Sequence, residues 1–270
     1  MCSFCGKYTQ HYGSNYLHAA LKSPLNDALC YECYMMESER CLECGDLKGK
    51  NVLVIDASTR LGSHICKKLM NTGCRLIMMA YDEYSNKNLF ELRLIVSDHT
   101  TTNQVEICSF SSQYDLLVHL NDMCLKYGKF DVVINYPDYI YEGGSNIGFF
   151  LNELDVLLQF IKQYDKSGKN KSYFINVANF GNKPCKCVGS YYNISYTKLK
   201  GNAYSELGII LNCIVCGYIV DYNTRDTIAP PNSIDNCVSK ILHPVFNKLE
   251  IPGAVYQNYK QTTDVELVLQ

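Results

Sequence analysis

Three Cys-x-x-Cys pairs within the first 44 residues carry the clearest chemistry in this sequence. In such a pair two thiolates on one tight turn can face the same ion, and two pairs complete a tetrahedral Zn²⁺ shell with bonds of about 2.3 Å. Four protein ligands leave no open position on the metal, so the predicted role of zinc here is structural rather than hydrolytic. The pairs are Cys2/Cys5, Cys30/Cys33 and Cys41/Cys44.

The number of zinc ions depends on two histidines. The first and second cysteine pairs would complete one site, whereas the third pair needs two more ligands. His11 and His18 are the only histidines in the segment. In chain order, these four ligand pairs match a cross-brace that holds two ions. A single four-cysteine ribbon with surface histidines is the alternative, and free thiols or disulfides are a further one.

Composition favours a small metal-stabilised domain in front of a larger one. Residues 1–46 are too few and too polar for an adequate apolar core, and structural zinc would supply about 10–16 kcal/mol of folding free energy. Residues 47–270 form the second predicted domain. The 15 cysteines and the lack of a signal segment favour a reducing, cytoplasmic setting. The longest apolar run, 207–220, is too short for a membrane span, and the net charge is only −2.

From residue 48 onward, short apolar runs alternate with amphipathic segments. This alternation predicts an α/β fold with a doubly wound parallel sheet, that is, a Rossmann-like domain. Strands are expected at 51–55, 75–80, 105–108, 130–135, 172–178, 209–216 and 254–259. Helices are expected at 60–72, 113–127, 151–165, 193–206 and 233–248.

Over residues 49–260, six landmarks stand in the order found in the short-chain dehydrogenase/reductase family, and the chain resembles that family. "GKNVLVIDASTRLGSHICKKL" is similar to its first strand and phosphate turn, and "YGKFDVVINYP" to its strand ending in Asn-Asn-Ala-Gly. "SYFINVANFG" resembles the strand that brings the catalytic serine, and "YYNISYTKLKG" stands where Tyr-x-x-x-Lys is expected. "LGIILNCIVCGYI" and "IPGAVYQNY" match the last two strands.

The resemblance implies a cofactor turn with three glycines, but this chain departs from it. Those places hold Asp56, Arg60 and Gly62. Asp56 would add a carboxylate near the pyrophosphate, and Arg60 a bulky side chain where the cofactor passes. Binding of NAD(P) is therefore doubtful. An alternative is that Ser58, Thr59 and Arg60 donate to a 2′-phosphate or another anion at the helix N-terminus.

The catalytic residues that the resemblance implies are also replaced. With the lysine placed at Lys198, the tyrosine position holds Ile194, and the serine position holds Asn179. A shifted register that pairs Tyr196 with Lys200 restores the four-residue spacing, but it moves both residues about half a turn around the helix. Asn146 matches the catalytic asparagine. These losses predict a degenerate dehydrogenase in which the scaffold is kept and the hydride chemistry is abandoned.

A lysine- and tyrosine-rich stretch suggests what the scaffold binds. Residues 166–205 contain seven lysines and no acidic residue, with aromatic residues interleaved. Cations for phosphates beside aromatic faces for bases are typical of single-stranded nucleic-acid surfaces. A solvated lysine face over core aromatics is the alternative. The candidate RNA-contacting residues are Lys183, Lys186, Lys198, Lys200, Tyr191 and Tyr192.

The sequence thus predicts a zinc-stabilised, non-catalytic binding module that docks on a large assembly, specifically a ribonucleoprotein such as the ribosome. A working NADP-dependent oxidoreductase that uses Tyr196 and Lys200 is the competing hypothesis. A ubiquitin-ligase-like cross-brace fused to a sensor fold is a third, and it rests only on ligand spacing.

Overall fold

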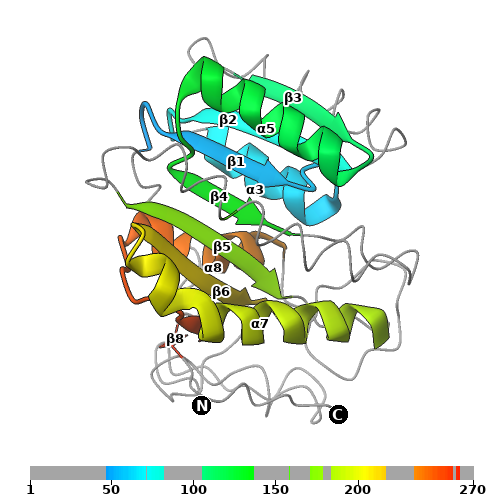
Figure 1. The fold of residues 1–270 in the computed structure, drawn as a ribbon. Helices are drawn as coiled ribbons and strands as arrows, with labels where there is room; N and C mark the ends of the chain where they lie inside the picture. Colours follow the sequence, from blue (N-terminus) through cyan, green and yellow to red (C-terminus); the bar gives the residue numbers. More distant parts are fainter. Residues whose placement is uncertain are drawn as a thin grey trace, which may run out of the picture.

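The computed structural model describes residues 47–70, 72–81, 105–136, 158, 171–178, 184–216, 234–257 and 260–261. An eight-stranded sheet forms the centre of this part of the chain, in the order β3-β2-β1-β4-β5-β6-β7-β8 (Figure 1). Its strands are β1 Asn51–Ile55, β2 Arg75–Tyr81, β3 Val105–Phe110, β4 Val132–Asn135, β5 Ser172–Ala178, β6 Ile209–Val215, β7 Val255–Gln257 and β8 Lys260–Gln261.

The strand pairing confirms the predicted doubly wound sheet. Every pairing from β3 across to β7 is parallel, and only β8 runs antiparallel, against β7. The order reverses at β1, which lies between β2 and β4. In open α/β sheets ligands bind outside the carboxyl ends of the strands at such a reversal. A functional site is therefore expected beyond the carboxyl ends of β1 and β4.

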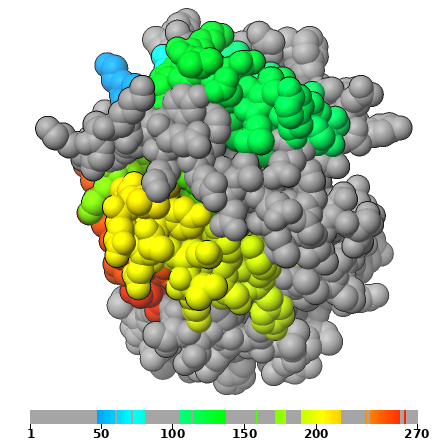
Figure 2. All heavy atoms as spheres, viewed as in Figure 1, coloured from blue at the N-terminus to red at the C-terminus, as the bar shows by residue number. Residues whose placement is uncertain are grey.

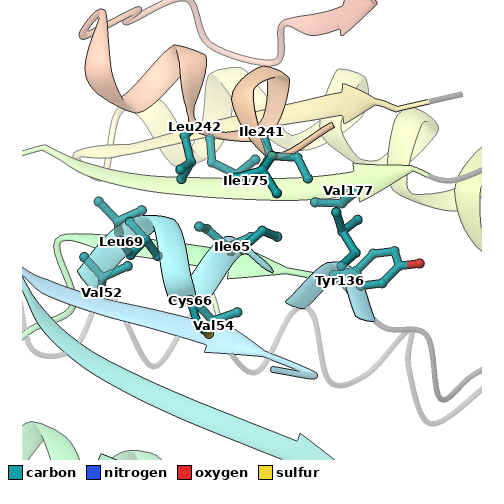
Figure 3. Packing of buried hydrophobic residues seen from close by; sticks show 14 of the residues in the cluster. Val52, Val54, Ile65, Cys66, Leu69, Tyr136, Ile175, Val177, Ile241 and Leu242 are labelled. Atoms are coloured by element: carbon teal, nitrogen blue, oxygen red, sulfur yellow. The ribbon is translucent and has the colours of Figure 1, made fainter. Parts of the chain in front are cut away.

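Helices cover both faces of the sheet. They are α3 Arg60–Met70, α5 Gln113–Tyr127, α7 Pro184–Ser205 and α8 Ile234–Phe246. Apolar residues of α3 and α8 share one buried cluster with the strands, and those of α5 and α7 share a second cluster on the opposite face. Figure 3 shows part of the first cluster, where Ile65 and Leu69 of α3 and Ile241 and Leu242 of α8 point toward the same strands.

Most predicted elements occur within two residues of their expected bounds, with two differences. Helix α7 begins at Pro184, nine residues before the predicted start, because proline is well suited to the first helical turn. The antiparallel strand β8 was not predicted. Of the helix predicted at 151–165, only Leu158 lies in the described part, where it is helical and buried.

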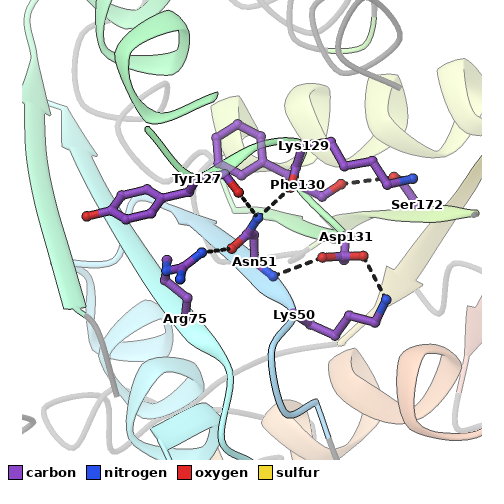
Figure 4. Close-up of polar contacts among 8 residues, drawn as sticks. All are labelled: Lys50, Asn51, Arg75, Tyr127, Lys129, Phe130, Asp131 and Ser172. Atoms are coloured by element: carbon purple, nitrogen blue, oxygen red, sulfur yellow. Dashed lines mark hydrogen bonds and ion pairs between the residues drawn. The ribbon is translucent and has the colours of Figure 1, made fainter. Parts of the chain in front are cut away.

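A group of polar contacts lies at the amino ends of the strands, opposite the carboxyl ends where a site is expected (Figure 4). The Asn51 amide donates to the carbonyl oxygens of Tyr127 and Lys129 at 2.9 and 2.8 Å. Arg75 donates to the Asn51 side-chain oxygen at 2.8 Å, and its guanidinium lies 4.4 Å from the centre of the Tyr127 ring. These contacts fix the starts of β1 and β2 against the end of α5.

Among the described residues, no helix has both the length and the apolar character needed to cross a membrane.

Candidate functional site

In the turn between β1 and α3, Asp56 replaces the first glycine but keeps the backbone conformation that glycine favours. Asp56 has a φ of 62° and is 2 % exposed. Such a left-handed conformation costs a non-glycine residue roughly 1–2 kcal/mol, with Asp tolerated better than most. The next amide, that of Ala57, donates to the Met79 carbonyl at 2.9 Å and ties the turn to β2. The tight turn therefore persists, and a buried carboxylate is at its start.

Gly62 is required by the close approach of α3 to this turn. A Cβ at this position would lie 2.4 Å from the Asp56 carbonyl oxygen and 2.9 Å from the Ala57 Cα. Both atoms belong to the backbone, so neither can move aside cheaply. Of the three glycine positions, this is the one whose packing role the chain has kept.

The Thr59 hydroxyl caps α3. The sequence had suggested this same hydroxyl as a hydrogen-bond donor to a bound anion. Its Oγ1 donates to the Asp56 carbonyl at 2.8 Å and accepts from the Gly62 amide at 3.1 Å. Because a hydroxyl has one proton, an anion would have to compete for it with this carbonyl. Ser58 is half-buried in the same turn. Arg60 begins α3, and its side chain lies outside the described residues.

A line of buried neutral side chains joins β4, β5 and α7 at the carboxyl edge. The Asn135 amide donates to the Asn176 side-chain oxygen at 2.9 Å, and the Asn176 amide donates to the Thr197 hydroxyl at 3.2 Å. One turn earlier on α7, Asn193 donates to the Val177 carbonyl at 3.1 Å. The Asn193 Oδ1 atom is buried and has no hydrogen-bond partner in the described part of the chain. These amides can hold a ligand, but at neutral pH none of them exchanges a proton.

Ile194 lies where the family resemblance places the catalytic phenol. Its side chain is 6 % exposed and packs with Ala178, Val215 and two other apolar residues in a small cluster of its own. The remaining members of that cluster are Cys213 and Val255. Lys198, one turn further along α7, is exposed. This position is therefore apolar and cannot supply the proton that carbonyl reduction needs.

The alternative catalytic pair is divided between core and surface. Tyr196 is 5 % exposed and belongs to the apolar cluster beneath α5 and α7. Its hydroxyl lies 3.5 Å from that of Tyr204, two turns further along the helix, and its ring packs on Tyr192 with centroids 5.5 Å apart. Lys200 is partly exposed. Tyr196 is thus a core residue whose phenol is paired with another phenol.

The outer side of α7 carries Tyr191 and Lys198 of the predicted RNA-contacting set. Tyr191 is 40 % exposed and Leu199 is 78 % exposed, with Lys198 between them also exposed. Figure 2 shows atoms of α7 on the molecular surface. Tyr192 is half-buried instead, because it packs on Tyr196. Lys171, from the same lysine-rich stretch, precedes β5 and forms an ion pair with Glu250.

Several predicted site residues lie outside the described part of the chain. These are the metal-ligand candidates Cys2, Cys5, His11, His18, Cys30, Cys33, Cys41 and Cys44, together with Asn146, Asn179, Lys183 and the side chain of Lys186. Within the described ranges, no group of three or more His, Cys, Asp or Glu side chains could hold a metal ion. The seven cysteines described there are buried free thiols. Of these, Cys213 and Cys216 are both 0 % exposed.

Comparison with known proteins bears on the fold. No family model matches the sequence, and no curated protein matches it either. A short-chain dehydrogenase from Mycobacterium smegmatis superimposes with a TM-score of 0.61 at 16 % identity, over 81 % of this chain and 95 % of that one. The RhlG/NADP active-site complex of Pseudomonas aeruginosa gives 0.62 at 14 % identity, over 78 % and 95 %. The chain has the fold of the short-chain dehydrogenases.

A third similar structure supports the same assignment. The citronellol catabolism dehydrogenase AtuB of Pseudomonas aeruginosa gives a TM-score of 0.61 at 12 % identity, over 79 % of this chain and 94 % of that one. The match therefore extends over nearly the whole length of each of these three proteins, and the short-chain dehydrogenase resemblance noted in the sequence is confirmed at the level of fold.

Sequence reasoning missed the buried polar line and one thiol contact. Asn176 is an isolated amide in the apolar run "YFINVA", which is a usable signal. Thr197 and Asn193 gave no such signal, because polar residues are common on helices. The contact between Cys216 and Cys237 joins residues 21 positions apart in the chain, and only the tertiary structure brings it about.

Proposed function

We propose that this chain is a non-catalytic binding module that uses the short-chain dehydrogenase fold as a scaffold. The observation that carries the proposal is the burial of Ile194 in an apolar cluster at the position of the catalytic phenol. An alkyl side chain transfers no proton, and the neighbouring Asn176 and Thr197 are neutral donors and acceptors engaged with each other. The residues around this position suit packing and recognition better than acid–base chemistry.

The cofactor turn supports the same proposal. Asp56 brings a carboxylate to the turn that, in this fold, runs beside the pyrophosphate, and the Thr59 hydroxyl is engaged in capping α3. Calorimetry of the full chain with NADH and NADPH tests this point. We expect weak binding or none for both cofactors. A dissociation constant in the low micromolar range would overturn the proposal.

An NADP-dependent oxidoreductase is a second candidate, and one observation favours it. Asp56 adopts the left-handed backbone that the tight turn needs, and Gly62 retains the close packing of α3, so the shape of the turn survives. The structurally similar RhlG was solved with NADP. In this case NADPH would bind, and cofactor oxidation with carbonyl substrates would be lost in Tyr196→Phe.

For the partner we propose a ribonucleoprotein such as the ribosome, contacted through the outer side of α7. Tyr191 offers an exposed ring and Lys198 a cation on this side, and the partly exposed Lys200 lies further round the same helix. Lys183 and Lys186 of the same stretch would extend this surface. Co-sedimentation of the purified chain with ribosomes over a salt series tests the proposal, because each lysine that neutralises a phosphate steepens the salt dependence. Sedimentation that is absent, or indifferent to salt, would contradict it.

The first 46 residues complete the proposal as a structural zinc domain of one or two ions. The dense cysteine pairs favour a reducing compartment, and we propose the cytoplasm. Zinc would stabilise a docking element too small to fold on its own core. Elemental analysis of the purified chain measures the metal directly.

A further inference from the structure

Two buried cysteines meet at the carboxyl edge of the sheet, outside the turn and the polar line described above. Cys216 directly follows β6, and Cys237 lies in the first turn of α8. Both are 0 % exposed and belong to the apolar cluster under α3 and α8. The Cys237 thiol lies 3.8 Å from the Cys216 carbonyl oxygen, to which it donates.

The two thiols also interact directly, and this changes their acidity in opposite directions. A hydrogen bond from Cys216 lowers the pKa of Cys237, and the positive charge of Lys240 lowers it further against the effect of burial. The same thiol–thiol bond, with burial, raises the pKa of Cys216 well above its usual range. Lys240 lies one turn along α8 and is only 3 % exposed, which is rare for lysine. Cys237 is therefore the more acidic of the two adjoining thiols.

A second pair of buried cysteines on the same face provides the contrast. The Cys74 thiol donates to the Leu69 carbonyl at 3.5 Å. Burial raises the pKa of both Cys66 and Cys74. Thiols in that state are poor nucleophiles, so burial alone does not make a cysteine reactive.

We propose that Cys216 and Cys237 are a peroxide-reactive pair that closes into a reversible disulfide, which joins the end of β6 to α8. Because both sulfurs are buried, the oxidant has to be small and uncharged, and hydrogen peroxide fits this requirement. Cys237 loses its proton and its sulfur attacks one peroxide oxygen, the O–O bond breaks, and the departing hydroxide takes up that proton and leaves as water. The resulting sulfenic acid condenses with the Cys216 thiol, which releases a second water. Two thiols are oxidised and one peroxide is reduced to two waters.

The disulfide would close residues 217–236 into a covalent loop. The start of this loop follows β6 at the same sheet edge as the polar line at Asn176. Oxidation would thus add a covalent link, across this edge, between two elements that the reduced protein joins by packing and by weak thiol hydrogen bonds. We expect the oxidised chain to unfold at a higher temperature than the reduced chain.

Peptide mapping of the full chain tests the proposal. Trypsin cleaves after Lys200, Arg225 and Lys240, so Cys216 and Cys237 fall in separate peptides, 201–225 and 226–240. After brief hydrogen peroxide treatment and alkylation of the remaining thiols, we expect these two peptides linked, with a mass two hydrogens below their sum. Dithiothreitol should separate them. Cys213 shares the first peptide, so fragment spectra must place the link on Cys216.

The variants keep the test specific. Cys213→Ser and Cys74→Ser should retain the link, whereas Cys237→Ser should lose it. If Cys237→Ser does not fold, the peptide map of the wild-type chain is sufficient, because it shows directly whether Cys216 and Cys237 are linked. Full alkylation of both residues after peroxide, a higher oxide of Cys237 without the link, or equal linkage of Cys66 to Cys74 would each overturn the proposal.

Discussion

The Asn135 amide donates to the side-chain oxygen of Asn176 at 2.9 Å, and this bond joins two neighbouring strands in the buried interior at the carboxyl edge. The Asn176 amide in turn donates to the hydroxyl of Thr197 on α7. Asn176 is 0 % exposed, and so is Thr197. Because buried polar groups are costly without partners, each member of this line depends on the others.

Replacing Asn176 by Ala should therefore destabilise the fold strongly. The change leaves the Asn135 amide without its acceptor and the Thr197 hydroxyl without its donor, and it opens a small cavity. We expect a loss of about 2–4 kcal/mol in the free energy of unfolding. Urea denaturation measures it. The exposed Asn202→Ala on α7 is the control and should change stability by less than about 0.5 kcal/mol.

The order of strands and helices was predictable from the sequence, because the alternation of apolar runs with amphipathic segments is a local pattern. Strands β1 and β5 and helix α5 have the predicted bounds. For α5 the ends have clear causes. The Ser112 hydroxyl accepts from the Asp115 amide, and Gly128 ends the helix at a φ of 85°. Such caps are legible in a sequence.

The site was less predictable, since its properties depend on which face of a helix a side chain occupies. The spacing of Tyr196 and Lys200 fits a catalytic pair, but Tyr196 is buried beside Tyr204. Tyr191 and Tyr192 were equivalent in sequence, and only the structure separates an exposed ring from a packed one. The left-handed backbone of Asp56 was likewise hidden, because the sequence showed only that glycine had been lost.

Asp56→Gly should strengthen cofactor binding if the cofactor occupies the turn at all. It removes a carboxylate that would repel a pyrophosphate placed about 6 Å away by roughly 2–3 kcal/mol per phosphate charge, at an effective dielectric constant near 20. Glycine also adopts the φ of 62° freely. We expect at least tenfold tighter NADPH binding than wild type by calorimetry. Asp122→Asn on α5, which removes the same charge elsewhere, should change nothing. Equal affinities for wild type and Asp56→Gly would mean that the cofactor does not pass this turn.

Acidification should destabilise the fold through His243. Burial holds the pKa of this side chain below its ordinary value of 6.5, and its Nδ1 atom lies 2.9 Å from the Asn247 amide nitrogen. The unfolded chain then binds more protons than the folded chain at pH values between the folded and unfolded pKa values. The neutral ring therefore makes its full contribution to stability above about pH 6.5. This contribution is lost as the pH falls from the unfolded pKa of His243 toward its lower folded pKa. Urea titrations at pH 7.5 and 5.5 should show a smaller pH-dependent loss in His243→Gln than in wild type. Equal losses would exclude His243 as the cause.

Zinc removal should unfold the N-terminal segment alone. We expect one or two zinc ions per chain by elemental analysis, and Cys33→Ser should lower that number and expose residues 1–46 to protease. The sheet domain should keep its thermal transition, because its core is formed by its own apolar clusters. Cys74→Ser, at a buried thiol of the sheet domain, is the control and should leave the zinc content unchanged. A metal-free chain with a protease-resistant N-terminus would contradict the zinc prediction.

The RNA hypothesis makes opposite predictions for two adjacent tyrosines. Tyr191 is 40 % exposed, so Tyr191→Ala should weaken ribosome association by about 1–3 kcal/mol if its ring stacks on a base, with no change in melting temperature. Tyr192 packs on Tyr196, so Tyr192→Ala should lower the melting temperature instead. Reversing the charges of Lys183, Lys186 and Lys198 together should release the chain from ribosomes and flatten the salt dependence.

Reversal of Lys67, Lys68 and Lys248 changes the net charge equally and provides the matched control, since it leaves α7 intact. If both triple variants sediment alike, general charge rather than this helix governs association. If neither tyrosine nor the α7 lysines affect association, the partner is better sought among proteins than among RNAs. Co-sedimentation over a salt series, with a melting curve for every variant, distinguishes these outcomes because binding loss and unfolding are then measured on the same samples.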